Sequence, residues 1–145
     1  MMKIVVFLAF CSTLTFAEIS CDFDKVHGFE SQPASTIPYE LSKSTSEYSA
    51  GSSVTLQIRG NDQYPFRGFY VRAFDVNTKS PIGAWNNLEG SKTMDPCNAV
   101  MQSDRDDKQF VKLEWKAPAE SSGKVYFKAL IMQDYSTYWS NVLVY

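Results

Sequence analysis

The expected architecture follows most directly from Phe66-Arg67-Gly68-Phe69-Tyr70-Val71-Arg72-Ala73. Gly68 stands between two aromatic residues, where it lets the backbone bend or pass close to a neighbour. Arg67 has a stem long enough to lie along an apolar surface with its charged head in water. From Phe69 onward the side chains alternate with the two-residue period of a β-strand. One face of this predicted strand carries Phe69, Val71 and Ala73, and the other, amphipathic face carries Tyr70, Arg72 and Phe74.

Other short runs repeat this period, and turns rich in Gly, Pro, Ser, Asn and Asp separate them. They cover residues 54–58, 82–85, 111–115, 125–132 and 139–145. No window shows a convincing helical stripe. The pattern predicts an all-β, antiparallel β-sandwich, with residues 18–46 as an extended lead-in and residues 86–108 as a long polar loop. We expect Trp115 in the core, because Val111 and Leu113 share its face.

The first residues are typical of a secretory signal peptide. Lys3 gives a positive start, residues 4–10 are an unbroken apolar run, and Thr15-Phe16-Ala17 places small residues where a signal peptidase reads them. We expect residues 1–17 to be removed, leaving a single domain over residues 18–145. The apolar run is far shorter than the ~20 residues of a membrane-spanning helix. The sequence therefore predicts a soluble, secreted, extracellular protein with no membrane span.

The net charge indicates which partners to expect, and the cysteines indicate a disulfide. Removal of Lys3 with the signal peptide leaves 13 basic and 16 acidic side chains, a net charge of −3. Binding to nucleic acid needs a basic excess or stripe, so we expect no such partner. Removal of Cys11 leaves only Cys21 and Cys97. In an oxidising compartment such a pair is most simply a disulfide, and two free thiols are the alternative.

Catalytic and metal-binding patterns are weak. His27 is the only histidine and has no free cysteine to activate, so we expect neither enzyme activity nor a cofactor. Two cysteines and one histidine lack the close ligand spacing of zinc sites. Asp104-Arg105-Asp106-Asp107 clusters carboxylates, but Gln109 and Trp115 stand where a calcium-binding EF-hand loop needs Gly and Glu. A solvated loop is the expectation there.

A set of short motifs resembles the reeler domain family in order and spacing, over nearly all of the chain from Cys21 onward. The motifs are Tyr48-Ser49-Ala50-Gly51, Phe66-Arg67-Gly68-Phe69, Pro81-Ile82-Gly83, Cys97, Trp115-Lys116-Ala117-Pro118, Gly123 and Tyr138-Trp139. The resemblance implies an immunoglobulin-like sandwich and favours pairing of Cys21 with Cys97. The family includes small secreted insect-type defence proteins and larger matrix proteins. A chain made of little more than this domain looks like the first kind.

Two groups of side chains are candidates for ligand binding. Outward-facing aromatics could stack on sugar rings or a partner protein, with ordinary packing as the alternative. They are Tyr70, Phe74, Tyr126, Tyr135 and Tyr138. Four lysines bracket one turn and could form a basic patch for polyanionic glycans, provided that their strands lie side by side. They are Lys112, Lys116, Lys124 and Lys128.

The leading hypothesis is a non-enzymatic defence protein of innate immunity that recognises microbial surface glycans or lipopolysaccharide. The resemblance carries this hypothesis, since no residue demands it. One alternative is an extracellular-matrix or adhesion module that binds heparin-like glycans or a host protein partner. Another is a structural secreted protein without a soluble ligand.

Overall fold

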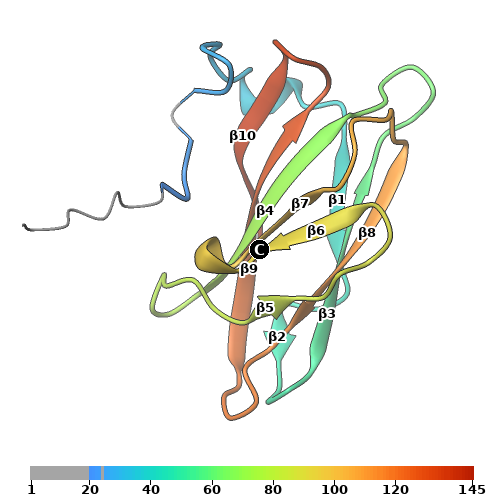
Figure 1. The fold of residues 1–145 in the computed structure, drawn as a ribbon. Coiled ribbons are helices and arrows are strands. Elements are labelled where there is room, and N and C mark those ends of the chain that lie inside the picture. Colours follow the sequence, from blue (N-terminus) through green and yellow to red (C-terminus); the bar gives the residue numbers. More distant parts are fainter. Residues whose placement is uncertain (1–19, 24) are drawn as a thin grey trace, which may run out of the picture.

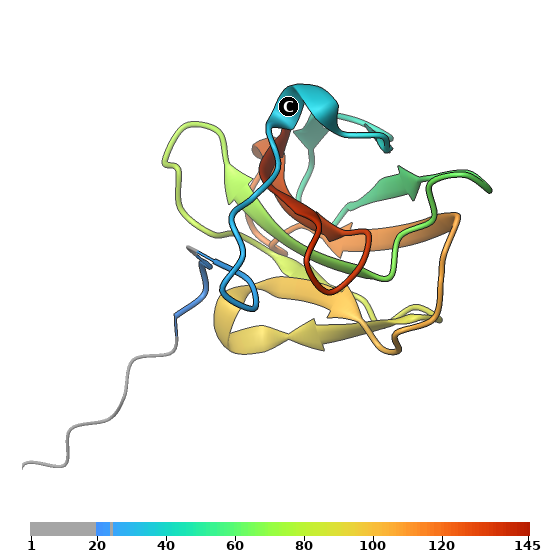
Figure 2. The ribbon, with the colours of Figure 1, turned by 90° about the horizontal axis from the view of Figure 1, so that it is seen from above.

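The computed structural model describes residues 20–23 and 25–145, and the expected signal peptide lies outside these residues. Two antiparallel sheets face each other (Figures 1 and 2). The first has the order β1 (Glu40–Lys43), β3 (Ser53–Arg59), β8 (Phe110–Lys116) and β5 (Ala84–Trp85). The second has the order β10 (Tyr138–Val144), β9 (Gly123–Met132), β4 (Gly68–Asp75), β7 (Ala99–Gln102) and β6 (Ser91–Met94), and β2 (Glu47–Tyr48) also pairs with β9. The predicted all-β class with antiparallel sheets is confirmed.

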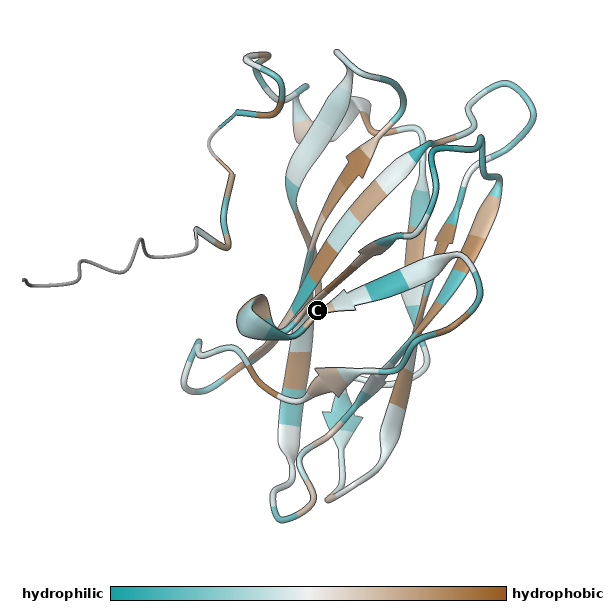
Figure 3. Ribbon diagram, viewed as in Figure 1, coloured by the Kyte–Doolittle hydropathy of each residue, from teal (hydrophilic) through white to brown (hydrophobic). Residues whose placement is uncertain are grey.

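The core lies between the sheets, where the inward side chains of β3 and β8 meet those of β4 and β9. Brown bands alternate with pale ones along these strands in Figure 3, as a strand with one face in the core requires. Trp115 is fully buried, as the sequence predicted, and its indole nitrogen donates to the carbonyl of Ile82 at 2.9 Å. Gly83 adopts φ +71, and an added Cβ there would lie 2.5 Å from the Trp115 ring. The Trp115 ring can therefore pack at this position only because residue 83 has no side chain.

Several motif residues hold turns and core contacts. The backbone nitrogen of Gly51 donates to the carbonyl of Pro118, and that of Ala117 to the carbonyl of Ser52, each at 2.8 Å. These two bonds tie the turn after β2 to the end of β8. Phe66 is fully buried, and Trp139 is 5% exposed with its indole nitrogen bonded to the Thr36 hydroxyl.

The segment 86–108 is not the plain loop that its polarity predicted. It contains β6, the short 3-10 helix η2 (Asp95–Cys97) and β7, and β7 pairs with β4 through Tyr70 and Met101. These strands have four residues each, too few to display a clear period of two. Pairing of β7 with the central strand β4, and of β6 with β7, makes them strands, and not their local pattern.

The lead-in is also more regular than predicted. It includes the 3-10 helix η1 (Ala34–Thr36) and strand β1. Before η1, residues 20–23 and 25–29 lie on the outer face of the six-stranded sheet, where Cys21 and Val26 pack against a second apolar cluster around Tyr70, Leu130 and Tyr138. The central strand β4 is consequently buried on both faces.

Candidate ligand-binding surface

The outer face of the six-stranded sheet carries the polar and aromatic side chains that point away from the core. In the β4–β9 ladder Arg72 lies opposite Lys128, and Phe74 lies opposite Tyr126. Since alternate residues of a strand share a face, these four side chains form two adjacent rows on one surface. The sequence pattern predicted the shared face of Arg72 and Phe74 on β4 and the outward facing of Tyr126 on β9.

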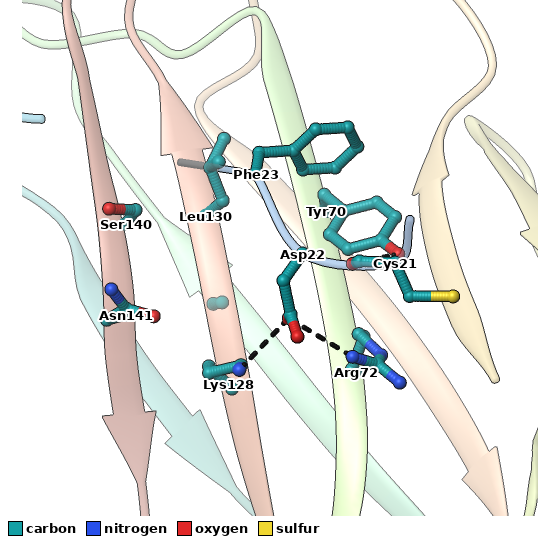
Figure 4. Close-up of a pocket in the computed structure, with 10 residues that line it drawn as sticks. Cys21, Asp22, Phe23, Tyr70, Arg72, Lys128, Leu130, Ser140 and Asn141 are labelled. Atoms are coloured by element: carbon teal, nitrogen blue, oxygen red, sulfur yellow. Dashed lines mark hydrogen bonds and ion pairs between the residues drawn. The ribbon is translucent and has the colours of Figure 1, made fainter. Parts of the chain in front are cut away.

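Arg72 and Lys128 converge on one carboxylate from the lead-in. A single oxygen, Oδ1 of Asp22, accepts from Nη1 of Arg72 at 3.1 Å and from Nζ of Lys128 at 3.1 Å (Figure 4). Partial burial alone would raise the pKa of Asp22, but the hydrogen bonds and charges of Lys128 and Arg72 outweigh it and place the pKa below its ordinary value. Asp22 is therefore ionised at neutral pH.

Arg72 is positioned by more than this ion pair. Its Nε donates to the carbonyl of Cys97 at 3.0 Å, and its guanidinium carbon lies 5.0 Å from the centre of the Phe74 ring. The Lys128 ammonium lies 5.1 Å from the same ring. Two cations thus lie over one aromatic ring, an arrangement in which the ring quadrupole stabilises positive charge.

A short aromatic row continues from Phe74. Phe74 stacks on Tyr126 with ring centres 5.4 Å apart, and Tyr126 stacks on the terminal Tyr145 at 5.0 Å. Nζ of Lys79 lies 5.4 Å from the centre of the Tyr126 ring. Phe74 is buried by its neighbours, Tyr126 is half-buried, and Tyr145 is 63% exposed. The row therefore presents open ring surface beside positive charge.

A shallow hollow lies next to the ion cluster. Its walls include Phe23, Arg72, Lys128, Ser140 and Asn141, as Figure 4 shows. Its volume is ≈ 40 Å³, far below the several hundred Å³ of an enclosed small-molecule pocket. This hollow can take one small polar group, while the rest of a ligand would lie across the surface.

A second exposed aromatic group sits where the lead-in meets the β9–β10 loop. The rings of His27 and Tyr135 stack with centres 3.8 Å apart, and Nδ1 of His27 donates to the carbonyl of Tyr135 at 2.8 Å. Phe29 meets the Tyr135 ring edge-on. Tyr135 is 66% exposed, so the facing predicted for it is correct.

Two of the tyrosines proposed as outward ligand contacts are buried, and that prediction is wrong for them. Tyr138 is fully buried, with its hydroxyl donating to the carbonyl of Phe29 at 2.7 Å and accepting from the nitrogen of Val26 at 3.2 Å. The hydroxyl of Tyr70 donates to the carbonyl of Cys21 at 2.9 Å. Both point to the outer face as predicted, but the lead-in covers that part of the face.

The four lysines do not form the predicted basic patch. The chain crosses between sheets after β8, so Lys112 and Lys116 lie exposed on the four-stranded sheet, whereas Lys124 and Lys128 lie on the six-stranded sheet. Only Lys128 joins the ion cluster. The positive charge of the candidate surface comes instead from Arg72, Lys79 and Lys128, with Lys124 exposed further along the same face of β9.

The remaining predicted residues have structural partners. Cys21 and Cys97 are joined in a disulfide, which fixes the lead-in to η2. Arg67 is exposed and its Nε donates to Asp107 at 2.8 Å, rather than lying free in water. Gly68 leaves room for Gln102, whose side-chain oxygen accepts from the backbone nitrogen of Phe69.

Sequence reasoning missed Asp22, Lys79 and Tyr145 as parts of this surface. Asp22 follows Cys21, and the predicted disulfide to Cys97 was the signal that would have placed it near β4 and β7. In the part of the chain that the structure describes, no group of three or more His, Cys, Asp or Glu side chains is arranged to hold a metal ion. Among the described helices, none has the length and apolar character to cross a membrane.

Two antiparallel sheets with a lead-in tethered by a disulfide define an all-β domain. The chain belongs to the reeler domain family, because the model of that family matches residues 19–144. It is similar to the crystal structure of the human F-spondin reeler domain, with a TM-score of 0.60, 22% identity and coverage of 74% of this chain and 86% of that chain. At this identity the likeness shows the fold alone.

Relatives by sequence include insect proteins named for defence. The chain is 32% identical over 136 residues to "Putative defense protein 1" of Antheraea mylitta, covering 86% of this chain and 80% of that protein. "Putative defense protein 2" of Antheraea mylitta is 31% identical, with 86% of this chain and 83% of that protein covered. "Putative ferric-chelate reductase 1" of Danio rerio is 22% identical, and the match spans 21% of its length.

Proposed function

We propose that this chain is a secreted, non-enzymatic defence protein that recognises microbial surface glycans or lipopolysaccharide through the outer face of its six-stranded sheet. The defence role is supported by relatives named as defence proteins that match along most of their length. Secretion is supported by the predicted signal peptide and by the Cys21–Cys97 disulfide, since such bonds persist in oxidising compartments. We also interpret the two facing sheets as an immunoglobulin-like sandwich.

The observation that carries the proposed ligand class is the aromatic row beside three cations. Tyr126 and Tyr145 stack 5.0 Å apart, Lys79 lies over the Tyr126 ring, and Arg72 and Lys128 flank Phe74. Rigid aromatic rings give contact area at low entropy cost, which suits the apolar faces of sugar rings. Cations beside them suit the phosphate and carboxylate groups of lipopolysaccharide and acidic glycans.

The open shape of the surface supports a polymeric ligand. The hollow next to Arg72 and Lys128 holds ≈ 40 Å³, so it can accept one charged group and not a whole sugar ring. The exposed rings of Phe29 and Tyr135 lie where the same lead-in continues beyond the ion cluster. We infer that a long glycan chain lies across the face and makes several weak contacts.

The same cations favour one second candidate, an adhesion or matrix module that binds heparin-like chains. Sulfate groups carry the charge that Arg72, Lys79 and Lys128 complement. In that case binding would depend mainly on charge and would fall steeply as salt rises. Binding to a neutral glycan through aromatic stacking would respond little.

The test is sedimentation of the protein with microbial cell-wall material, comparing Tyr145→Ala with Phe110→Ala. Tyr145 lies on the proposed surface. Phe110 serves as the matched control, because it is an aromatic residue that is 44% exposed on the other sheet. Loss of an aromatic contact that dominates binding costs about 2 kcal/mol, so we expect about a thirtyfold loss for Tyr145→Ala. Phe110→Ala should bind as the wild type does.

Variants that remove one lysine charge, and retention of the protein on a heparin column, test the role of the cations. Lys79→Gln should weaken cell-wall binding, whereas Lys112→Gln, on the opposite sheet, should not. Retention on heparin together with no cell-wall binding would overturn the defence proposal in favour of the matrix alternative. Equal losses for Tyr145→Ala and Phe110→Ala would overturn the proposed surface.

A further inference from the structure

The cation pair on the outer face is held by rigid elements, but the carboxylate between the cations is not part of any strand. Arg72 lies in the central strand β4 and Lys128 in β9, and the two residues are direct partners in the ladder. Asp22 belongs to the lead-in next to the disulfide, and its side chain is 64% exposed. The cations are thus preorganised, while their partner reaches them from outside the sheet.

The two cations are less exposed to water than the Asp22 carboxylate that lies between them. The Arg72 side chain is 9% exposed and that of Lys128 is 27% exposed, against 64% for Asp22. Buried positive charge without a counter-charge is costly, whereas an exposed carboxylate is well solvated by water. An anion beside Arg72 is therefore stabilising. A rotation of the Asp22 side chain would leave room for a different anion at the same position.

We propose that Arg72 and Lys128 form an oxyanion site in which the Asp22 carboxylate is an internal ligand that a phosphate or sulfate group of the bound molecule displaces. This inference rests on the proposed function, because it names the group of the glycan that this part of the surface takes. Displacement needs no movement of the backbone at Cys21, which the disulfide and the hydrogen bond from the Tyr70 hydroxyl hold in place.

The hollow beside the ion pairs gives the incoming group its room. Ser140 and Asn141 line it from β10 (Figure 4), and they bring a hydroxyl and an amide as donors. The β9–β10 register shifts between Trp139 and Val142, and Asn141 has a φ of +54. Such bulges re-aim side chains next to binding sites.

Competition with Asp22 makes the site selective for charge. A carboxylate offers the cations the same single charge that Asp22 already supplies, so it gains little by replacing it. Inorganic phosphate carries about 1.5 to 2 negative charges near neutral pH, by analogy with a phosphorylated side chain. We therefore expect phosphate and sulfate to bind more tightly than acetate.

The experiment measures binding of inorganic phosphate, sulfate and acetate by titration followed in NMR spectra of the whole mature chain. Asp22→Asn removes the internal charge, and Asp107→Asn is the matched control, because it breaks the exposed Arg67–Asp107 pair elsewhere. We expect Asp22→Asn to bind phosphate about tenfold more tightly than the wild type, the equivalent of about 1.4 kcal/mol. Asp107→Asn should bind phosphate as the wild type does.

Lys128→Gln keeps the inference open to refutation if Asp22→Asn folds poorly, because an unchanged phosphate affinity in this variant would also overturn the oxyanion site. Lys128→Gln alone should weaken phosphate binding, and adding it to Asp22→Asn should remove the gain. Equal phosphate affinities of wild type and Asp22→Asn, or a gain that survives Lys128→Gln, would overturn the oxyanion site.

Cell-wall binding separates this inference from the proposed function. Cell-wall binding that depends on Tyr145, without a phosphate gain in Asp22→Asn, overturns the oxyanion site alone. A phosphate gain in a protein that does not bind cell walls overturns the proposed function and leaves the oxyanion site standing.

Discussion

Replacing Trp115 by alanine removes a large side chain that is fully buried between the two sheets. Its ring meets Tyr48 at 5.3 Å and Phe127 at 6.2 Å between centres, and both of these residues belong to the six-stranded sheet, so the substitution removes contacts between the two sheets. An aromatic side chain buries about 150–250 Å², which at about 25 cal/mol per Å² gives a transfer term of about 4–6 kcal/mol as an upper figure. Measured losses for such truncations are about 3–5 kcal/mol, and we expect Trp115→Ala to fall in that range.

Trp115→Phe separates packing from hydrogen bonding at the same position. Phenylalanine keeps much of the ring but leaves the Ile82 carbonyl without the indole donor that lies 2.9 Å away. An unsatisfied buried acceptor costs about 1–3 kcal/mol, so this variant should lie between the wild type and Trp115→Ala.

The assay is equilibrium unfolding in urea, with the slope of the transition checked for constancy among the variants. A loss below about 1 kcal/mol for Trp115→Ala would refute the reasoning, because surface positions give changes of that size. The folded fraction of each variant should still bind cell-wall material, since Trp115 lies between the sheets and not on the outer face.

Two further predictions concern the disulfide and a buried carboxylate. Replacing Cys21 or Cys97 by serine should cost about 2–5 kcal/mol, and the intact mass of unreduced mature protein after alkylation should show no free thiol; two alkylated thiols would contradict the bond. Asp75 accepts hydrogen bonds from the Thr78 and Asn77 nitrogens and the Tyr48 hydroxyl, and the first of these contributes most to holding its pKa below the ordinary 3.8. Because the folded-state pKa is lowered, this stabilisation is complete above about pH 4 and is lost as pH falls through the folded-state value. Urea titrations between pH 2 and 6 should show Asp75→Asn less stable by about 1–2 kcal/mol at pH 6, with a smaller loss on acidification than the wild type; parallel pH profiles would contradict it.

The alternation of side chains was enough to predict the facing of β4 and β9. Arg72 and Phe74 fall on the same side as Tyr126 and Lys128, and the ladder places them opposite one another. The alternation of side chains predicts on which side of the sheet a residue lies. It does not predict whether another segment of the chain covers that side. Tyr138 faces outward as its pattern predicted, yet residues from the lead-in bury it completely.

Sheet membership was a second limit of the sequence. Lys116 and Lys124 flank one turn, but β8 and β9 belong to different sheets, so the two lysines lie on separate surfaces. The length of the connection does not determine whether the second strand pairs with the first or lies in the other sheet. The contribution of Asp22 likewise depends on a disulfide that closes 76 positions of sequence, a distance over which local pattern carries no information.

The most direct test of the account is NMR mapping of a solubilised cell-wall glycan on the isotopically labelled protein. Our account predicts that shift changes concentrate on the outer face of the six-stranded sheet, at Arg72, Tyr126, Lys128 and Tyr145. Changes concentrated instead around Lys112 on the four-stranded sheet, or none at saturating glycan, would contradict it.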